Sequence, residues 1–143
     1  GGQILAGGER LKDGPLDRGF YAALTVAEVP ETSEVWNTEL FLPLVTIASV
    51  AGLDEAIARA NDTEYGLTAG IYSSDEREIE RYFDAVEASV IYANRRSGAT
   101  TGAWPGMQPI SGWKASGSTG KGTGGPYYIQ QYMREQSRTI VSA

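Results

Sequence analysis

The sequence predicts an α/β protein whose sheet is mostly parallel. Between residues 44 and 94, three short apolar segments alternate with two segments whose apolar residues recur at helical spacing. A strand–helix–strand–helix–strand order needs crossover connections, which place successive strands parallel to one another. The 143 residues can bury the core of one domain but are too few for a nucleotide domain plus a substrate domain.

Two further strands are expected before this unit, in the apolar segments QILAGG (3–8) and FYAALTV (20–26). Glycine and proline residues between them predict a loop over residues 9–19. Residues 29–44 carry a proline near each end, and Pro43 favours an extended conformation for the residue before it. We therefore expect a loop with at most one helical turn before the parallel unit.

The first strand of the parallel unit is LVTIASV, residues 44–50. Its β-branched, continuously apolar composition is typical of a strand buried on both faces. A helix should follow over residues 53–62, where acidic residues in the first turn complement the helix dipole. Its apolar face consists of Leu53, Ala56, Ile57 and Ala60.

The second half of the unit repeats this order. LTAGIY (67–72) predicts a strand, SSDEREIERYFDAVEA (73–88) a helix, and SVIYAN (89–94) a third strand. Ser73 and Glu76 have the spacing of a capping box at the start of the helix. Its apolar face consists of Ile79, Tyr82, Phe83 and Val86.

Towards the C-terminus, Pro126 stands at a favoured first helical position, so PYYIQQYM (126–133) predicts the start of a helix. The alternation in REQSRTIVS (134–142) predicts a terminal strand.

Composition excludes several kinds of chemistry. The chain has no cysteine and no histidine, which removes thiolate nucleophiles, imidazole bases and the usual zinc ligands, so no metal site is predicted. Twelve basic and eighteen acidic residues give a net charge of −6, which disfavours nucleic acid and anionic membranes as partners. No apolar run approaches the roughly 18 residues of a membrane span. We expect a soluble, cytoplasmic protein.

The glycine-rich stretch SGWKASGSTGKGTGG (111–125) raises the question of phosphate binding. A Walker A loop places glycine five residues before the glycine of its Gly-Lys pair and Ser or Thr after the lysine. Around Gly120 and Lys121 these positions hold Ala115 and Gly122. A surface loop is therefore favoured over a phosphate cradle, and an independent nucleotide-binding domain is the weakest hypothesis.

Three segments together resemble the C-terminal third of an aldehyde dehydrogenase: ELFLPL (39–44), EAIARANDTEYGLTAGIYSSD (55–75) and MQPISGWKASGSTGK (107–121). The resemblance implies a three-layer αβα fold with a mostly parallel sheet. Residues 1–132 would form the C-terminal portion of the catalytic domain. Residues 133–143 would form an oligomerisation strand that extends the sheet of a partner subunit in a homo-oligomer.

Within that superfamily, GGPYYIQQYMREQSRTI (124–140) is most similar to the 1-pyrroline-5-carboxylate dehydrogenases. The resemblance implies oxidation of glutamate semialdehyde to glutamate with NAD, or with NADP, as the cofactor.

The family's E-x-F-x-P motif falls on Glu39, Phe41 and Pro43. By this resemblance, Glu39 would bind the hydroxyls of the nicotinamide ribose and Phe41 would pack beside the nicotinamide ring. A carboxylate can accept two hydroxyl hydrogen bonds, and an aromatic face can shield a ring that receives hydride. Leu42 stands where the family usually has glycine, which questions any loop conformation that needs a positive φ there.

The segment 95–112 resembles the loop that anchors the aldehyde. Gly98 and Ala99 are our candidates for donating backbone N–H groups to the substrate α-carboxylate, and Gly102 with Ala103 forms a rival register. Ile110 would supply the apolar wall where the family usually has phenylalanine.

Arg95 and Arg96, which precede the candidate donors, could assist an acidic substrate, although exposed arginine pairs are more often solvated or ion-paired.

The family's nucleophilic cysteine, its general-base glutamate and its Rossmann domain would all lie upstream of Gly1. We therefore expect the chain alone to be inactive, with the cofactor bound mainly by the upstream domain. Two alternatives stay open: a catalytically empty assembly or regulatory module of this fold, and a dehydrogenase for another semialdehyde.

Overall fold

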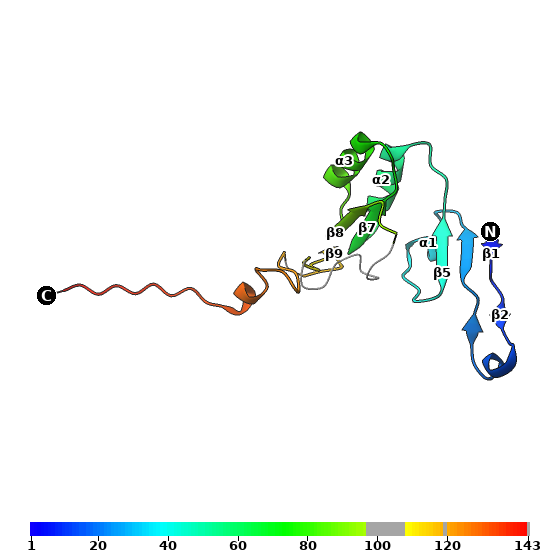
Figure 1. Ribbon diagram of the computed structural model, residues 1–143, viewed down its shortest axis with the longest axis horizontal. Helices are drawn as coiled ribbons and strands as arrows, with labels where there is room; N and C mark the ends of the chain where they lie inside the picture. The colour runs from blue at the N-terminus through cyan, green and yellow to red at the C-terminus, as the bar shows by residue number, and fades with distance from the viewer. Residues whose placement is uncertain (97–107, 119, 143) are drawn as a thin grey trace. The chain divides into compact units, whose positions relative to one another are not determined.

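The computed structural model describes residues 1–96, 108–118 and 120–142 (Figure 1). The chain divides into two compact units, Gly1–Ala51 and Gly52–Ala143.

The first unit is built on a three-stranded sheet with the order β1-β4-β5. Strand β1 (Gln3–Ala6) pairs antiparallel with β4 (Thr25–Glu28), and β4 pairs parallel with β5 (Leu44–Ile47). The register between β4 and β5 is unbroken, from Thr25 opposite Leu44 to Glu28 opposite Ile47. Ala27, in the middle of this sheet, is buried.

The predicted strand over residues 20–26 is two strands that belong to different sheets. Strand β3 (Tyr21–Ala22) pairs antiparallel with β2 (Arg10–Leu11), and the 3-10 helix η1 (Gly14–Arg18) connects them. The exposed Phe20 and Leu24 flank β3, so the apolar run does not mark one buried strand. Residues 9–19, which were expected to form a loop, thus contain β2 and η1 and belong to the β2–β3 hairpin.

The segment that precedes β5 contains α1 (Glu34–Asn37), a single helical turn, as predicted. The prediction of a strand buried on both faces was wrong for β5, because Val45 is 53% exposed and Ile47 is 43% exposed. Among the described residues β5 pairs with β4 alone, so it lies at the edge of its sheet.

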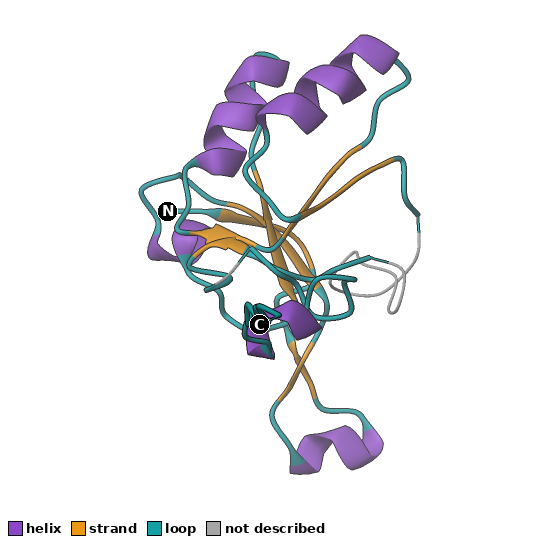
Figure 2. Ribbon diagram, turned by 90° about the vertical axis from the view of Figure 1, so that its left-hand side faces the viewer, coloured by secondary structure: helices purple, strands orange, loops and turns teal. Residues whose placement is uncertain are grey.

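In the second unit, two helices alternate with two parallel strands. The order is α2 (Leu53–Asn61), β7 (Thr68–Ile71), α3 (Glu76–Ala85) and β8 (Val90–Ala93). Strand β7 pairs parallel with β8 from Thr68 opposite Val90 to Ile71 opposite Ala93. In Figure 2 the two helices are the long purple ribbons at the top, and both lie on the same side of the β7–β8 pair.

The core of this unit lies between the helices and the β7–β8 pair. Three residues are each at most 6% exposed: Ile57 of α2, Tyr82 of α3, and Val86 just after α3. The predicted apolar faces of both helices are thus confirmed at their central positions, although Phe83 is 39% exposed. Burial raises the pKa of Tyr82 to about 12, with a smaller contribution from Tyr92. The residues packed against this cluster are Leu53, Ala69, Ile71, Ala85 and Ile91.

Helix α3 begins later than predicted. Its N-cap is Asp75, whose carboxylate accepts a hydrogen bond of 2.9 Å from the Arg77 backbone N–H. The Arg77 side chain also donates to this carboxylate and, with that N–H, lowers the pKa of Asp75. Ser73 instead donates to Glu78. Asp75 thus takes the capping role predicted for Ser73 because it lies next to the first free backbone N–H groups.

The end of α3 is set by a side chain from α2. Asn61 donates through Nδ2 to the Ala85 carbonyl at 2.8 Å, and its Oδ1 accepts from the Glu87 N–H at 2.8 Å. These groups would otherwise bond within a longer helix, so α3 stops at Ala85 and not at residue 88.

The glycine-rich stretch folds back on itself. Strand β9 (Trp113–Lys114) pairs antiparallel with β6 (Tyr65–Gly66), and Ile110 forms an isolated bridge with Thr123. A Cβ at position 117 would lie 1.9 Å from the Ser111 carbonyl oxygen, so only glycine permits this approach.

The structure after the glycine-rich stretch differs from the prediction. The helix expected from Pro126 is a turn followed by the 3-10 helix η2 (Ile129–Tyr132). Residues 133–142 are exposed and have no regular secondary structure. A β-strand needs a neighbour that satisfies its backbone groups. The terminal strand therefore stays a prediction.

The α/β class is confirmed, with mixed strand pairing. Among the described residues, β4–β5 and β7–β8 are parallel, and β1–β4, β2–β3 and β6–β9 are antiparallel. The predicted first strand of the parallel unit, β5, pairs in a different sheet from β7 and β8. The three-layer, mostly parallel arrangement and the boundary at residue 132 stay predictions.

We expect Ile57→Ala to lower the free energy of unfolding by about 2–4 kcal/mol, because it leaves a cavity beside Tyr82 and Val86. Ile140→Ala is the matched control, since it deletes the same atoms at a position that is 95% exposed. Urea denaturation followed by far-ultraviolet circular dichroism measures both. Equal losses in the two variants would show that Ile57 is not a core residue.

Candidate functional site

The predicted cofactor residues lie together on one loop of the first unit. Glu39 and Phe41 line the same surface pocket, which has a volume of about 320 Å³. Trp36 from α1 and Thr46 from β5 also contribute to its wall. Phe41 is 92% exposed, so its ring is available to a ligand. The structure thus brings an accessible carboxylate and an accessible aromatic ring to one concave site.

Pro43 fixes the end of this loop on the sheet. The Leu44 N–H donates to the Leu42 carbonyl at 2.7 Å, which closes a three-residue turn around Pro43. The Pro43 carbonyl accepts a 2.8 Å hydrogen bond from the Thr25 N–H of β4. Because β4 is the central strand, the loop is anchored to the most constrained part of its unit.

The left-handed residue in the loop is Phe41 and not Leu42. Phe41 has a φ of 45°, whereas Leu42 is not among the described non-glycine residues with positive φ. Leucine in place of the family's glycine is therefore free of the strain that the sequence suggested. The strain falls on Phe41 instead, where an L-residue pays roughly 1–2 kcal/mol for this conformation.

An accessible carboxylate beside an accessible ring suits the two parts of a nicotinamide riboside. The Glu39 oxygens can accept hydrogen bonds from ribose hydroxyls, and the Phe41 ring offers an apolar face to a flat heterocycle. The residues that the chain presents in this pocket therefore fit a nicotinamide cofactor.

The predicted substrate donors cannot be placed in the same way. Gly98 and Ala99, and the rival pair Gly102 and Ala103, lie outside the described residues. Arg95, just before them, lies over the Tyr92 ring at 5.7 Å from its centroid, and its carbonyl accepts a hydrogen bond from the Tyr72 hydroxyl.

Asn94 controls how the chain leaves β8, and sequence reasoning missed it. Its φ is 53°, and its side chain both accepts from the Ser73 N–H at 3.0 Å and donates to the Ser73 carbonyl at 2.8 Å. The Asn94 side chain thus makes the two hydrogen bonds to Ser73 that the backbone of one more strand residue would make beyond the end of β7. Asparagine tolerates the left-handed region better than most residues, which was the available signal.

Ile110, the predicted apolar wall, is half-buried in the second unit. Its N–H donates to the Thr123 carbonyl at 3.0 Å. The next residue, Ser111, makes two hydrogen bonds to the Ser89 hydroxyl, each of 3.3 Å. One is donated by the Ser111 N–H and the other by the Ser111 hydroxyl. Ile110 is therefore held by its own backbone hydrogen bond and by the contacts of Ser111 with Ser89, which lies just before β8.

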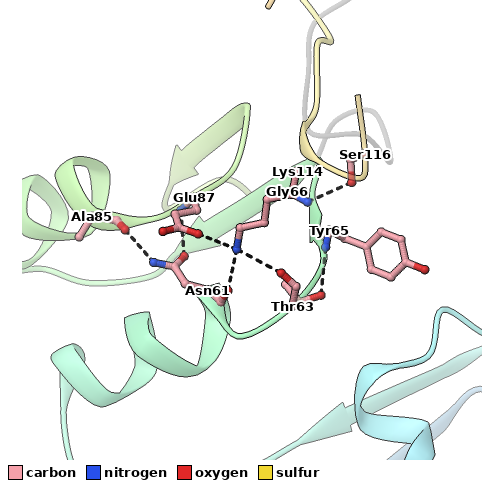
Figure 3. A network of polar contacts seen from close by, with 8 residues as sticks. All are labelled: Asn61, Thr63, Tyr65, Gly66, Ala85, Glu87, Lys114 and Ser116. Atoms are coloured by element: carbon pink, nitrogen blue, oxygen red, sulfur yellow. Dashed lines mark hydrogen bonds and ion pairs between the residues drawn. The ribbon is translucent and has the colours of Figure 1, made fainter. Parts of the chain in front are cut away.

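Two lysines of the glycine-rich stretch behave differently. Lys121, which a Walker A loop would have used, lies over the Tyr127 ring at 4.9 Å from its centroid. Lys114 instead contacts two backbone carbonyls at the end of α2 and the Glu87 carboxylate just after α3, as Figure 3 shows. Sequence reasoning did not single out Lys114, because a lysine in a glycine-rich segment is normally solvated.

Within residues 1–96, 108–118 and 120–142, no group of three or more acidic, cysteine or histidine side chains is placed to hold a metal ion. No helix in that part of the chain is both long and apolar enough to cross a bilayer.

Glu39 and Phe41 share a pocket on the loop before β5, and Ile110 lies in the second unit, which contains the parallel β7–β8 pair. The aldehyde dehydrogenase family model matches residues 1–138, and the chain belongs to that family.

Within the family, the chain is similar to 1-pyrroline-5-carboxylate dehydrogenases. The chain is 36% identical over 137 residues to the 1-pyrroline-5-carboxylate dehydrogenase of Bacillus thuringiensis (strain Al Hakam), a match that covers 95% of this chain and 25% of that protein. The chain thus spans about a quarter of the length of the curated relatives it matches.

Solved structures of aldehyde dehydrogenases also resemble this chain in fold. A mutant of the Thermus thermophilus 1-pyrroline-5-carboxylate dehydrogenase superposes with a TM-score of 0.78 at 35% identity, over 90% of this chain and 24% of that one. A Staphylococcus aureus betaine aldehyde dehydrogenase in complex with NAD+ gives a TM-score of 0.80 at 26% identity, over 92% and 25%.

We expect Phe41→Gly to be more stable than Phe41→Ala by about 1 kcal/mol. Both changes remove the ring, but only alanine keeps the Cβ that strains a φ of 45°. Urea denaturation of the two variants gives the difference. The reverse order would indicate that residue 41 does not adopt the left-handed conformation in solution.

Proposed function

We propose that this chain forms part of an NAD-dependent aldehyde dehydrogenase that oxidises glutamate semialdehyde to glutamate. The observation that carries the proposal is the pocket in which Glu39 and Phe41 lie together, on a loop anchored to the central strand of its sheet. The family membership supports the reaction type. The similarity to 1-pyrroline-5-carboxylate dehydrogenases supports the substrate.

Glu39 would orient the nicotinamide ribose by accepting two hydroxyl hydrogen bonds. Phe41 would cover one face of the nicotinamide and keep water from it, and its exposed position suits that contact. When bound, NAD supplies the hydride acceptor for the aldehyde. We favour NAD over NADP because the similar proteins from Thermus and S. aureus were solved with bound NAD.

On the substrate side, Gly98 and Ala99 would donate backbone N–H groups to the α-carboxylate. Backbone donors hold a carboxylate without adding a titrating group, and glycine lets the chain approach it closely. Ile110 would form the apolar wall beside the aldehyde carbons. Because isoleucine is smaller than phenylalanine, the wall leaves more room, and this leaves another semialdehyde as the second candidate substrate.

The thiol that attacks the aldehyde must come from residues outside this sequence, because these 143 residues contain no cysteine. The same holds, in our proposal, for the glutamate base and for most of the cofactor site. The chain by itself would therefore bind parts of both ligands without turning them over.

In the complete enzyme, we expect Glu39→Gln to slow hydride transfer by about 10-fold, because the amide holds the ribose less firmly and misplaces the nicotinamide. Stopped-flow NADH formation at saturating NAD and glutamate semialdehyde measures this step. Glu34→Gln is the control, since Glu34 lies in the first turn of α1 and outside the pocket. Unchanged turnover in Glu39→Gln would remove Glu39 from the cofactor site.

The C-terminal segment suggests how subunits associate. Residues 133–142 are exposed and unpaired by any described strand, and their apolar members include Ile140 and Val141, which are 95% and 86% exposed. We assign this segment to strand addition on the sheet of a second copy. The chain would then form a homo-oligomer.

Removal of residues 133–143 should convert the complete enzyme to a smaller species in sedimentation velocity, because the added strand is lost. Replacing Ile140 and Val141 by aspartate tests the same contact without shortening the chain. An unchanged sedimentation coefficient in both variants would rule the segment out as the subunit contact.

A further inference from the structure

The ammonium group of Lys114 is fully engaged at the end of helix α2. Its Nζ lies 2.6 Å from the Asn61 carbonyl, 3.2 Å from the Thr63 carbonyl and 2.6 Å from Glu87 Oε2. Three acceptors match the three protons of an ammonium group. The side chain is only 24% exposed, so water competes weakly for these contacts.

The location of these acceptors explains why a lysine suits the position. The Asn61 and Thr63 carbonyls lie at and just beyond the C-terminus of α2, where carbonyls without an intrahelical partner carry partial negative charge. Glu87 lies just after α3. Lys114 therefore joins the ends of both helices to the segment that carries it (Figure 3).

The backbone around Lys114 is held as firmly as its side chain. Lys114 lies opposite Tyr65 in the β6–β9 pair, and the Ala115 N–H donates to the Glu64 carbonyl at 2.9 Å. The Gly66 N–H donates to the Ser116 hydroxyl at 3.0 Å. Lys114 itself has a φ of 51°, an unfavourable conformation for lysine that the surrounding contacts enforce.

This rigid turn connects directly to the proposed substrate wall. The Gly117 backbone packs against the Ser111 carbonyl, and Ser111 follows Ile110. Because Gly117 packs so closely against Ser111, a displacement of the Lys114 contacts would also displace Ile110. Close backbone packing thus links Gly117 to Ser111, and Lys114 seats this segment on the α2 and α3 ends.

We infer that Lys114 is a positioning residue for the aldehyde pocket: it fixes the segment 110–117 on the helix ends and thereby sets the location of the Ile110 wall. The inference rests on the proposed function, because it assigns a consequence for substrate binding to that wall. It predicts that loss of the Lys114 contacts weakens aldehyde binding and leaves cofactor binding intact, since Glu39 and Phe41 lie on another segment.

The test uses the complete dehydrogenase that contains this chain and compares Lys114→Met, Glu87→Gln and Arg81→Gln with the wild type. Methionine keeps most of the lysine's apolar length and removes the ammonium group. Arg81→Gln is the matched control because it breaks an exposed ion pair between the same two helices, Arg81 to Asp54 at 3.1 Å, without touching residues 110–117.

Steady-state kinetics and amide hydrogen exchange are measured on each protein. In Lys114→Met we expect the KM for glutamate semialdehyde to rise by about tenfold, within the hundredfold cost of a 1 Å misplacement, while the KM for NAD is unchanged. Exchange at the Ala115 amide should accelerate in parallel. Glu87→Gln should change both quantities in the same direction by less, and Arg81→Gln should change neither.

The inference is overturned if Ala115 exchanges faster in Lys114→Met while the aldehyde KM stays at the wild-type value, because Lys114 would then be only structural. An equal rise of that KM in Arg81→Gln also overturns it. If Lys114→Met does not fold, Glu87→Gln decides, and an unchanged aldehyde KM there counts against the inference. A wild-type enzyme that oxidises no aldehyde refutes the proposed function before any variant is compared.

Discussion

The side-chain amide of Asn61 is the contact on which the second unit depends. It ends α3 by donating to the Ala85 carbonyl and accepting from the Glu87 N–H, and the backbone carbonyl of Asn61 accepts a hydrogen bond from Lys114. One residue thereby sets where the second helix stops and where the glycine-rich segment is seated. The apolar cluster of Ile57, Tyr82 and Val86 holds the helices together, but it is nondirectional and cannot specify these end points.

The sequence predicted well whatever depends on local periodicity. The central positions of both helices, Ile57 and Tyr82, are buried as their spacing indicated, and β7 and β8 pair in parallel. Prediction failed where a distant partner decides the outcome. The end of α3 depends on a side chain 24 residues earlier, and β5 pairs with β4 of its own unit.

The candidate site shows the same division. The resemblance identified Glu39 and Phe41, which do share a pocket. Sequence reasoning missed Asn94 and Lys114, because their importance comes from tertiary contacts. Phe41, Asn94 and Lys114 are the non-glycine residues with positive φ among those described. Each lies on or beside a segment that we propose to bind a ligand. Backbone strain of this kind persists only where the surroundings enforce it, and it concentrates at functional sites.

The edge position of β5 has a consequence for the chain in a cell. One side of this strand has no hydrogen-bonded neighbour among the described residues, and Val45 and Ile47 are exposed on it. An open, apolar edge is a template for strands of other molecules. Wherever no other strand covers this edge, the chain would be prone to aggregate and to bind chaperones.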